Sequence, residues 1–139
     1  MNIIATRAPT TTVTLSDVAA TGGRLLLGAI FLLSGWSKLG DPAATVGYIQ
    51  SVGLPFAQLG VAVAIAVELI GGALLVVGYR TKLAAAALAL FTFVAAIFFH
   101  SALGDQNQFI HFFKNIAIVG GLLQVIAFGS GRLSLERRA

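Results

Sequence analysis

Four long apolar stretches constrain what this chain can fold into more than any other feature of its sequence. They cover about residues 22–39, 57–78, 83–100 and 109–128. Each is close to the roughly 20 residues that a helix needs to cross the hydrocarbon core of a bilayer. None alternates apolar and polar residues as a strand of a membrane barrel does. We therefore expect an all-α membrane protein whose four transmembrane helices form a bundle.

The composition excludes a water-soluble monomer. Charged residues make up 10% of the 139 residues and hydrophobic residues 58%, whereas soluble domains carry about 25% charged residues. The chain has no cysteine, which excludes a disulfide scaffold, a thiolate metal site and electron transfer through paired cysteines. The basic residues are scattered at the ends of the apolar stretches, so they indicate membrane topology rather than a nucleic-acid site.

Lysine and arginine gather on one side of the predicted membrane. Only Lys38 and Lys114 fall on the other side, against seven residues near the two chain ends and in the loop between spans two and three: Arg7, Arg24, Arg80, Lys82, Arg132, Arg137 and Arg138. Positive charge marks the cytoplasmic side. We expect a polar cytoplasmic N-terminal segment (1–21), a four-span membrane domain (22–130) and a basic cytoplasmic tail (131–139).

A short interfacial helix is predicted between spans one and two. Asp41 can cap it, Pro42 suits its first turn, and Gly53 with Pro55 ends it. Because this segment follows the first span, it lies at the outer side of the bundle. It is either a capped connector or a lid over a cavity that opens outward.

The first span carries a stripe of residues at alternating steps of four and three. Its members are Arg24, Gly28, Phe31, Gly35 and Lys38. Residues at this spacing share one helical face, and small residues in membrane helices mark close helix contacts. The stripe therefore faces the bundle interior. Lys38, near the outer end, either points inward or extends to the surface.

Glu68 is the strongest single clue to a site. It lies 11 residues after Ala57, which at about 1.5 Å per residue is roughly 16 Å deep in the membrane. A carboxylate at that depth is costly, so it should face the interior and be paired or protonated. It either locks two helices together or handles protons or a ligand.

Further polar residues collect near the outer ends of the predicted helices. The uncharged run 115–128 is too short to cross the membrane alone, so Lys114 must lie inside the membrane region. Lys38, His100, His111 and Asn115 lie at a similar level. We expect a polar vestibule with Glu68 at its floor. Either Lys38 or Lys114 could be the counter-charge of Glu68, and we favour Lys114.

The two histidines raise the question of a haem. His100 and His111 both lie at the membrane edge, joined by a short loop. This position favours interfacial hydrogen bonding over bis-histidine haem ligation. We therefore predict no metal site and no required cofactor.

Several segments resemble the DoxX family of small bacterial inner-membrane proteins. They are RLLLGAIFLLSGWSKLG, GYIQSVGLP, VELIGGALLVVGYRTKLAA, FFHSALGDQNQFIHFFKNIAIVGGLL and GSGRLSL. The combination of GWSK, the ExxGG pattern of span two and the FxKN pattern of span four is the most specific part. The resemblance covers most of residues 24–135 and matches the family pattern at Trp36, Lys38, Glu68, Gly71, Gly72, His100, Lys114 and Asn115.

The resemblance implies a multi-pass protein of the bacterial inner membrane, often labelled an oxidoreductase. The first functional hypothesis is that the protein takes part in quinone-linked redox chemistry or anchors a membrane redox enzyme. Glu68 would then handle protons, and a quinone would be the bound molecule. The ligand-binding residues would be Trp36, Lys38, His100, His111, Lys114 and Asn115. The alternatives are a non-enzymatic binder or carrier of a small amphipathic molecule or lipid, and a structural assembly subunit.

The charge distribution makes a topology prediction. A reporter fused after Ala139 should be active only in the cytoplasm, and Gln106→Cys should react with a membrane-impermeant thiol reagent from outside the cell. Thiol labelling of whole cells and of inverted vesicles measures which side of the membrane each cysteine faces. An Arg80→Cys variant that reacts from outside would reverse the orientation.

Overall fold

The computed structural model describes residues 12–137, and over this range the chain is all helical. The helices are α1 Leu15–Gly40, α2 Pro42–Ser51, α3 Ala57–Val77, α4 Thr81–Phe99, α5 Gln106–Phe128 and the short 3₁₀ helix η1 Leu135–Arg137. Among the described residues, α1, α3, α4 and α5 are each long and apolar enough to cross a membrane. The predicted four-helix bundle is confirmed. Residues 1–11 of the predicted N-terminal segment and residues 138–139 of the predicted tail lie outside the described residues. Arg7 and Arg138, which the charge count includes, are among them.

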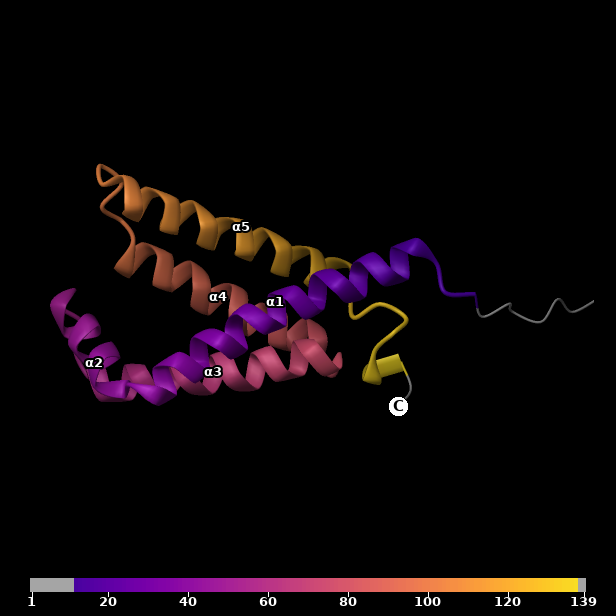
Figure 1. Cartoon of the computed structure of the whole chain (residues 1–139), viewed down its shortest axis with the longest axis horizontal. Coiled ribbons are helices and arrows are strands. Elements are labelled where there is room, and N and C mark those ends of the chain that lie inside the picture. Colours follow the sequence, from indigo (N-terminus) through magenta and orange to yellow (C-terminus); the bar gives the residue numbers. More distant parts are fainter. Residues whose placement is uncertain (1–11, 138–139) are drawn as a thin grey trace, which may run out of the picture.

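The four long helices form two pairs (Figure 1). α1 packs along α3, α4 packs along α5, and contacts between α3 and α4 join the pairs, whereas α1 and α5 meet at few positions. The pairs converge toward the end where the described chain begins and ends, and they diverge toward α2. The bundle is therefore a wedge that opens at the end opposite the two chain ends.

Two glycines let α1 and α3 cross with their backbones in contact. A Cβ atom placed on Gly28 would lie 2.9 Å from the carbonyl oxygen of Gly72, and one on Gly72 would lie 3.0 Å from the carbonyl oxygen of Gly28. Such close approach needs residues without side chains. The predicted inward face of span one is confirmed, since Arg24, Gly28, Phe31 and Gly35 are all buried.

The neighbouring Gly71 faces α4 rather than α1. A Cβ atom on Gly71 would lie 2.9–3.1 Å from three carbon atoms of the Leu88 side chain. Leu88 is fully buried, together with Leu75 and Leu122, in the core that joins α3, α4 and α5. The two consecutive glycines thus serve two different helix contacts.

The helix ends follow the local capping chemistry. α1 begins at Leu15, seven residues before the predicted start of span one, because Thr14 and Asp17 form a capping box. The predicted short helix between spans one and two is α2. Asp41 caps it by accepting a hydrogen bond from the Ala44 N–H, and Pro42 occupies its first turn.

Arg24 has a structural role that the charge count did not reveal. Its buried guanidinium donates hydrogen bonds to the carbonyls of Leu75 and Val76 at the end of α3, and to the carbonyl of Leu133 in the tail. A cation at a helix C-terminus complements the free carbonyls and the helix dipole. The Glu136 N–H also donates to the Gly78 carbonyl at 2.8 Å. The first part of the predicted tail is therefore docked against the bundle.

We predict that Gly28→Ala lowers the free energy of unfolding by about 1–3 kcal/mol, because its Cβ must push the α3 backbone away. Thermal unfolding of the purified protein in detergent measures the effect. Gly120→Ala is the matched control, since nothing lies within 4 Å of that position, and its stability should be unchanged or slightly higher. Equal losses in the two variants would contradict close packing at the crossing.

Candidate functional site

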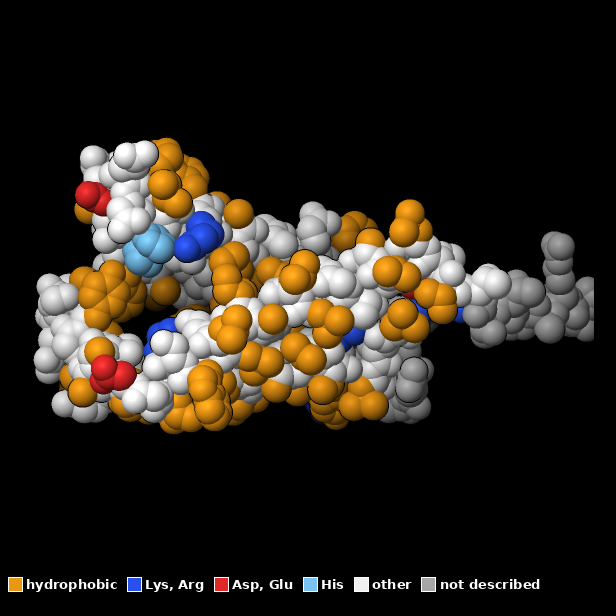
Figure 2. Space-filling view, in the orientation of Figure 1, with side chains coloured by type: hydrophobic (Ala, Val, Ile, Leu, Met, Phe, Trp, Pro, Cys, Tyr) orange, Lys and Arg blue, Asp and Glu red, His pale blue; other side chains and the backbone are white. Residues whose placement is uncertain are grey.

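A cavity of about 710 Å³ lies between the two helix pairs at the wide end of the wedge. Figure 2 shows this end hollowed, with lysine and histidine side chains beside the opening. We call it the outer cavity, after the side to which the charge count assigns it. Its walls are mostly apolar and come from α1, α3, α4 and α5, including Ile30, Phe31, Val63, Phe91 and Ile118.

An ion pair lies in the α1/α3 wall of the outer cavity. The Lys38 Nζ atom is 2.9 Å from Glu68 Oε2 and 3.0 Å from Oε1. The Ser34 hydroxyl donates to Glu68 Oε1 at 3.0 Å, and Lys38 Nζ donates to Ser34 Oγ at 2.7 Å. The Glu68 side chain is 6% exposed and that of Lys38 is 24% exposed. Lys38 therefore points inward, and the carboxylate is charge-paired in the middle of α3.

The expected pairing of Glu68 with Lys114 is wrong. α1 is the helix that approaches α3, because a Cβ atom on Gly35 would lie only 3.2 Å from the Glu68 Cβ. Lys38, three residues after Gly35, then reaches the carboxylate. Lys114 is on α5, which packs mainly against α4 rather than α3. Similar depth in the membrane does not make two residues neighbours.

The opposite wall carries the two histidines. The rings of His100 and His111 stack with centroids 5.1 Å apart and planes 23° apart. His100 Nδ1 shares a hydrogen bond with Gln108 Oε1 at 2.9 Å. The histidines thus make an interfacial contact between the end of α4 and the start of α5. Among residues 12–137, no three His, Asp or Glu side chains are grouped to hold a metal ion.

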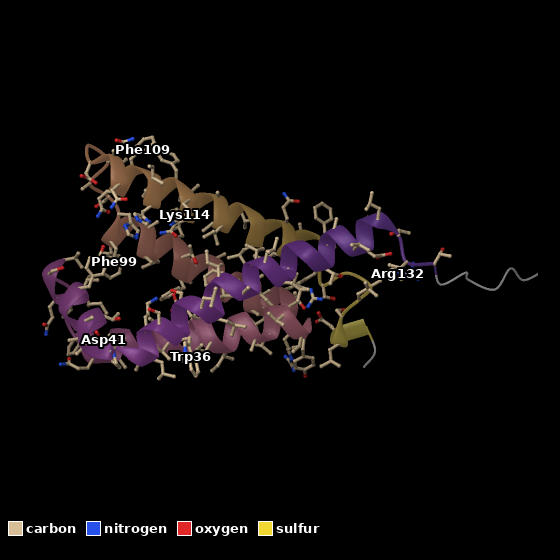
Figure 3. All side chains as sticks on the ribbon, viewed as in Figure 1. Trp36, Asp41, Phe99, Phe109, Lys114 and Arg132 are labelled. Carbon is tan, nitrogen blue, oxygen red and sulfur yellow. The ribbon has the colours of Figure 1, made fainter. Side chains whose placement is uncertain are left out.

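Lys114 and Thr92 are among the polar side chains of the outer cavity that have no hydrogen-bond or ion-pair partner within the described range. Lys114, labelled on α5 in Figure 3, lines the cavity beside Asn115 and makes no hydrogen bond or ion pair there. Thr92 also lines the cavity and is only 5% exposed, and its Oγ1 has no hydrogen-bond partner. A buried hydroxyl without a partner, such as that of Thr92, is rare in folded proteins and calls for an explanation, whereas Lys114 is exposed.

Helix α2 closes one side of the outer cavity. The Tyr48 ring stacks on Phe99 with centroids 5.1 Å apart, and its hydroxyl donates to the Phe99 carbonyl at 3.2 Å. Thr45, Tyr48 and Ile49 line the cavity. α2 is therefore a wall of the cavity as well as a connector.

The structure brings most of the predicted site residues together. Lys38, Glu68, His100, His111, Lys114 and Asn115 all line the outer cavity. Trp36 does not, because its side chain is 71% exposed on the outside of α1 (Figure 3). Sequence reasoning missed Ser34 and Thr92. Ser34 could have been found, since it lies one helical turn before Lys38.

We predict that Glu68→Gln and Lys38→Met each lower the thermal stability in detergent, because each leaves the other charge without its partner in a low dielectric. The double variant should recover much of the loss, with a coupling of about 0.5–3 kcal/mol. Lys114→Met is the matched control, and its effect should add to that of Glu68→Gln. If the stability losses of Glu68→Gln and Lys38→Met were simply additive in the double variant, the contact between the two side chains would contribute nothing to stability.

Comparison with known proteins agrees with this architecture. The DoxX family model matches residues 19–101. The inner membrane protein YqjF of Escherichia coli K12 is 32% identical over 123 residues, which cover 88% of this chain and 93% of that protein. The inner membrane protein YphA of the same organism is 31% identical over 83% of this chain and 86% of its own length. No solved structure matches. A family match over more than half of the chain and two relatives aligned over most of their length establish that this four-helix protein belongs to the DoxX family.

Proposed function

We propose that the protein binds a small amphipathic molecule with a carbonyl or anionic head in the outer cavity, and that it takes part in quinone-linked redox chemistry. The observation that carries the proposal is the buried, unpartnered hydroxyl of Thr92 on a largely apolar cavity of about 710 Å³, which is also lined by the exposed, unpaired Lys114. Apolar walls with a few polar groups are typical of small-molecule sites.

The charges that line the outer cavity indicate which kind of head group a ligand would have. Glu68 neutralises Lys38, so Lys114 remains as a cation with no counter-charge among the described residues. An unpaired ammonium in a membrane segment favours a ligand that brings a negative charge or a strong acceptor. Asn115 beside it can donate a further hydrogen bond through its amide.

The Thr92 hydroxyl supports a second polar contact deeper in the cavity. It is buried and unpartnered within the described range, so an acceptor on the ligand would replace the hydrogen bond that it lacks. A molecule with two separated oxygen atoms on an apolar ring suits this arrangement. A quinone has that form.

The triad of Lys38, Ser34 and Glu68 suits proton handling. Its three groups are joined by hydrogen bonds of 2.7–3.0 Å and border the cavity. A bound quinone would supply the redox chemistry, since reduction of a quinone to a quinol takes up two electrons and two protons. The triad would deliver or accept protons at the cavity wall.

Electrons would come from a partner enzyme. The chain has no cysteine and therefore no thiol pair to pass electrons. A membrane redox enzyme anchored by this bundle would supply them. The names of the two relatives support a location in the inner membrane, and the excess of Lys and Arg near the chain ends supports cytoplasmic termini.

A second candidate function is carriage of an anionic lipid or other amphiphile without chemistry. The observation that favours it is the sparse packing of α5, whose span is 11% buried against 22–33% for the other three. A ligand could then enter from the bilayer beside α5. In this function Glu68 would be coupled to Lys38, and Lys114 would bind the head group.

We predict that mild purification retains a small amphipathic molecule, identified by mass spectrometry. Thr92→Val keeps the shape of the side chain and removes its hydroxyl, so ligand occupancy should fall about threefold to tenfold while stability is kept. Lys114→Met should lower the ligand occupancy further. Trp36→Phe is the control outside the cavity, with unchanged occupancy.

The identity of the bound molecule separates the proposals. A quinone supports the redox function, and a lipid supports the carrier. A stoichiometric protein partner with no small molecule would contradict both and indicate an assembly subunit.

A further inference from the structure

A second cavity lies at the opposite end of the bundle. Its volume is about 560 Å³, and it is bounded by the start of α4, the end of α5 and the tail. We call it the tail pocket. Three cations line it: Arg80, Lys82 and Arg132. The charge count treats these residues as topology signals alone, but the fold brings them from two distant segments to one cavity.

Two of these cations have no polar partner within the described residues. Arg80 and Lys82 make no hydrogen bond or ion pair through their side chains within residues 12–137. Arg132 lies 3.9 Å from Asp17 and donates to the Thr12 carbonyl at 3.3 Å. Arg80 and Lys82 therefore carry charge that a ligand can use.

The acidic residues of the tail pocket have structural partners. Asp17 accepts hydrogen bonds from the Thr14 N–H at 2.9 Å and the Thr14 hydroxyl at 2.7 Å. Glu136 accepts from the Thr81 N–H at 3.5 Å and so caps the start of α4. Both carboxylates hold helix ends, and the pocket keeps an excess of positive charge.

The backbone of the tail makes room for this arrangement. Gly129 and Gly131 have φ angles of 82° and 76°, which L-residues with side chains rarely adopt. A Cβ atom on Gly129 would lie 3.5 Å from the Cε of Lys82. The tail thus turns back directly after α5 and lies beside the Lys82 side chain.

Apolar side chains border the same pocket. Phe128 is 82% exposed and Leu83 is 65% exposed, and both line the tail pocket. Phe128 is the last residue of α5, and Leu83 lies in the first turn of α4, so both are where a helix leaves the membrane. Basic residues next to lipid-facing apolar residues fit a molecule with an anionic head and acyl chains.

We propose that the tail pocket binds the phosphate head group of an anionic phospholipid. Arg80 and Lys82 contact the phosphate, and Phe128 and Leu83 contact the acyl chains. This inference does not depend on the function proposed for the outer cavity.

Thermal unfolding of the full chain in detergent tests the proposal, with phosphatidylglycerol, phosphatidylcholine or sodium phosphate added. Phosphatidylglycerol should raise the unfolding midpoint, and the other two should not. The double variant Arg80→Gln/Lys82→Gln should weaken phosphatidylglycerol binding about tenfold. These two side chains make no hydrogen bond or ion pair within the described residues, so the variant should keep its stability without lipid.

Lys114→Gln removes one cation at the other end of the molecule and serves as the control. It should keep the stabilisation by phosphatidylglycerol. If Lys114→Gln lost the stabilisation by phosphatidylglycerol and the double variant kept it, the lipid would bind in the outer cavity, and the proposal would be overturned. Equal stabilisation by phosphatidylcholine, or full stabilisation by sodium phosphate, would also overturn it.

Discussion

The contact between Gly28 and Gly72 is the constraint on which the rest of the bundle depends. Because neither residue has a Cβ, the backbones of α1 and α3 meet, and the rotation of α1 about its axis is set. One face of α1 then places Arg24 at the carbonyls that end α3 and Lys38 at the carboxylate of Glu68. A single crossing therefore determines the polar contacts at both ends of the helix pair.

The two ends of the bundle use polar groups differently. At the narrow end, Arg24 and Glu136 complete the hydrogen bonds of helix termini, so these groups stabilise the fold. At the wide end, the Thr92 hydroxyl and the Lys114 ammonium border a cavity without partners in the described part of the chain. The hydroxyls of Thr21 and Thr81, nearer the narrow end, also lack partners within the described residues, but neither lines the outer cavity or the tail pocket. The wide end is the better candidate for ligand chemistry because its unpartnered hydroxyl, Thr92, lines a largely apolar cavity together with the triad of Lys38, Ser34 and Glu68.

Helical periodicity made much of this structure predictable. The stripe through Gly28 and Gly35 was predicted to face the interior, and so was Glu68, as the buried residues of α1 and α3 confirm. The partner of Glu68 could not be predicted, because rise per residue gives depth but not which helices are neighbours. Apolarity also located the membrane-crossing part of α1 but not its start, which the Thr14 cap determines. Trp36 matched a family pattern, yet it faces away from the cavity.

The hydrogen bond between Arg24 and Leu133 has a consequence for the order of assembly. It joins residues that are 109 positions apart, one in the first helix and one in the tail. During synthesis, the guanidinium of α1 enters the bundle before its last acceptor exists. Helix pairing can begin as soon as α3 is inserted, since Leu75 and Val76 then provide two carbonyls. The hydrogen bonds of Arg24 at the narrow end are therefore complete only after the segment that contains Leu133 has been synthesised and has docked against α1 and α3.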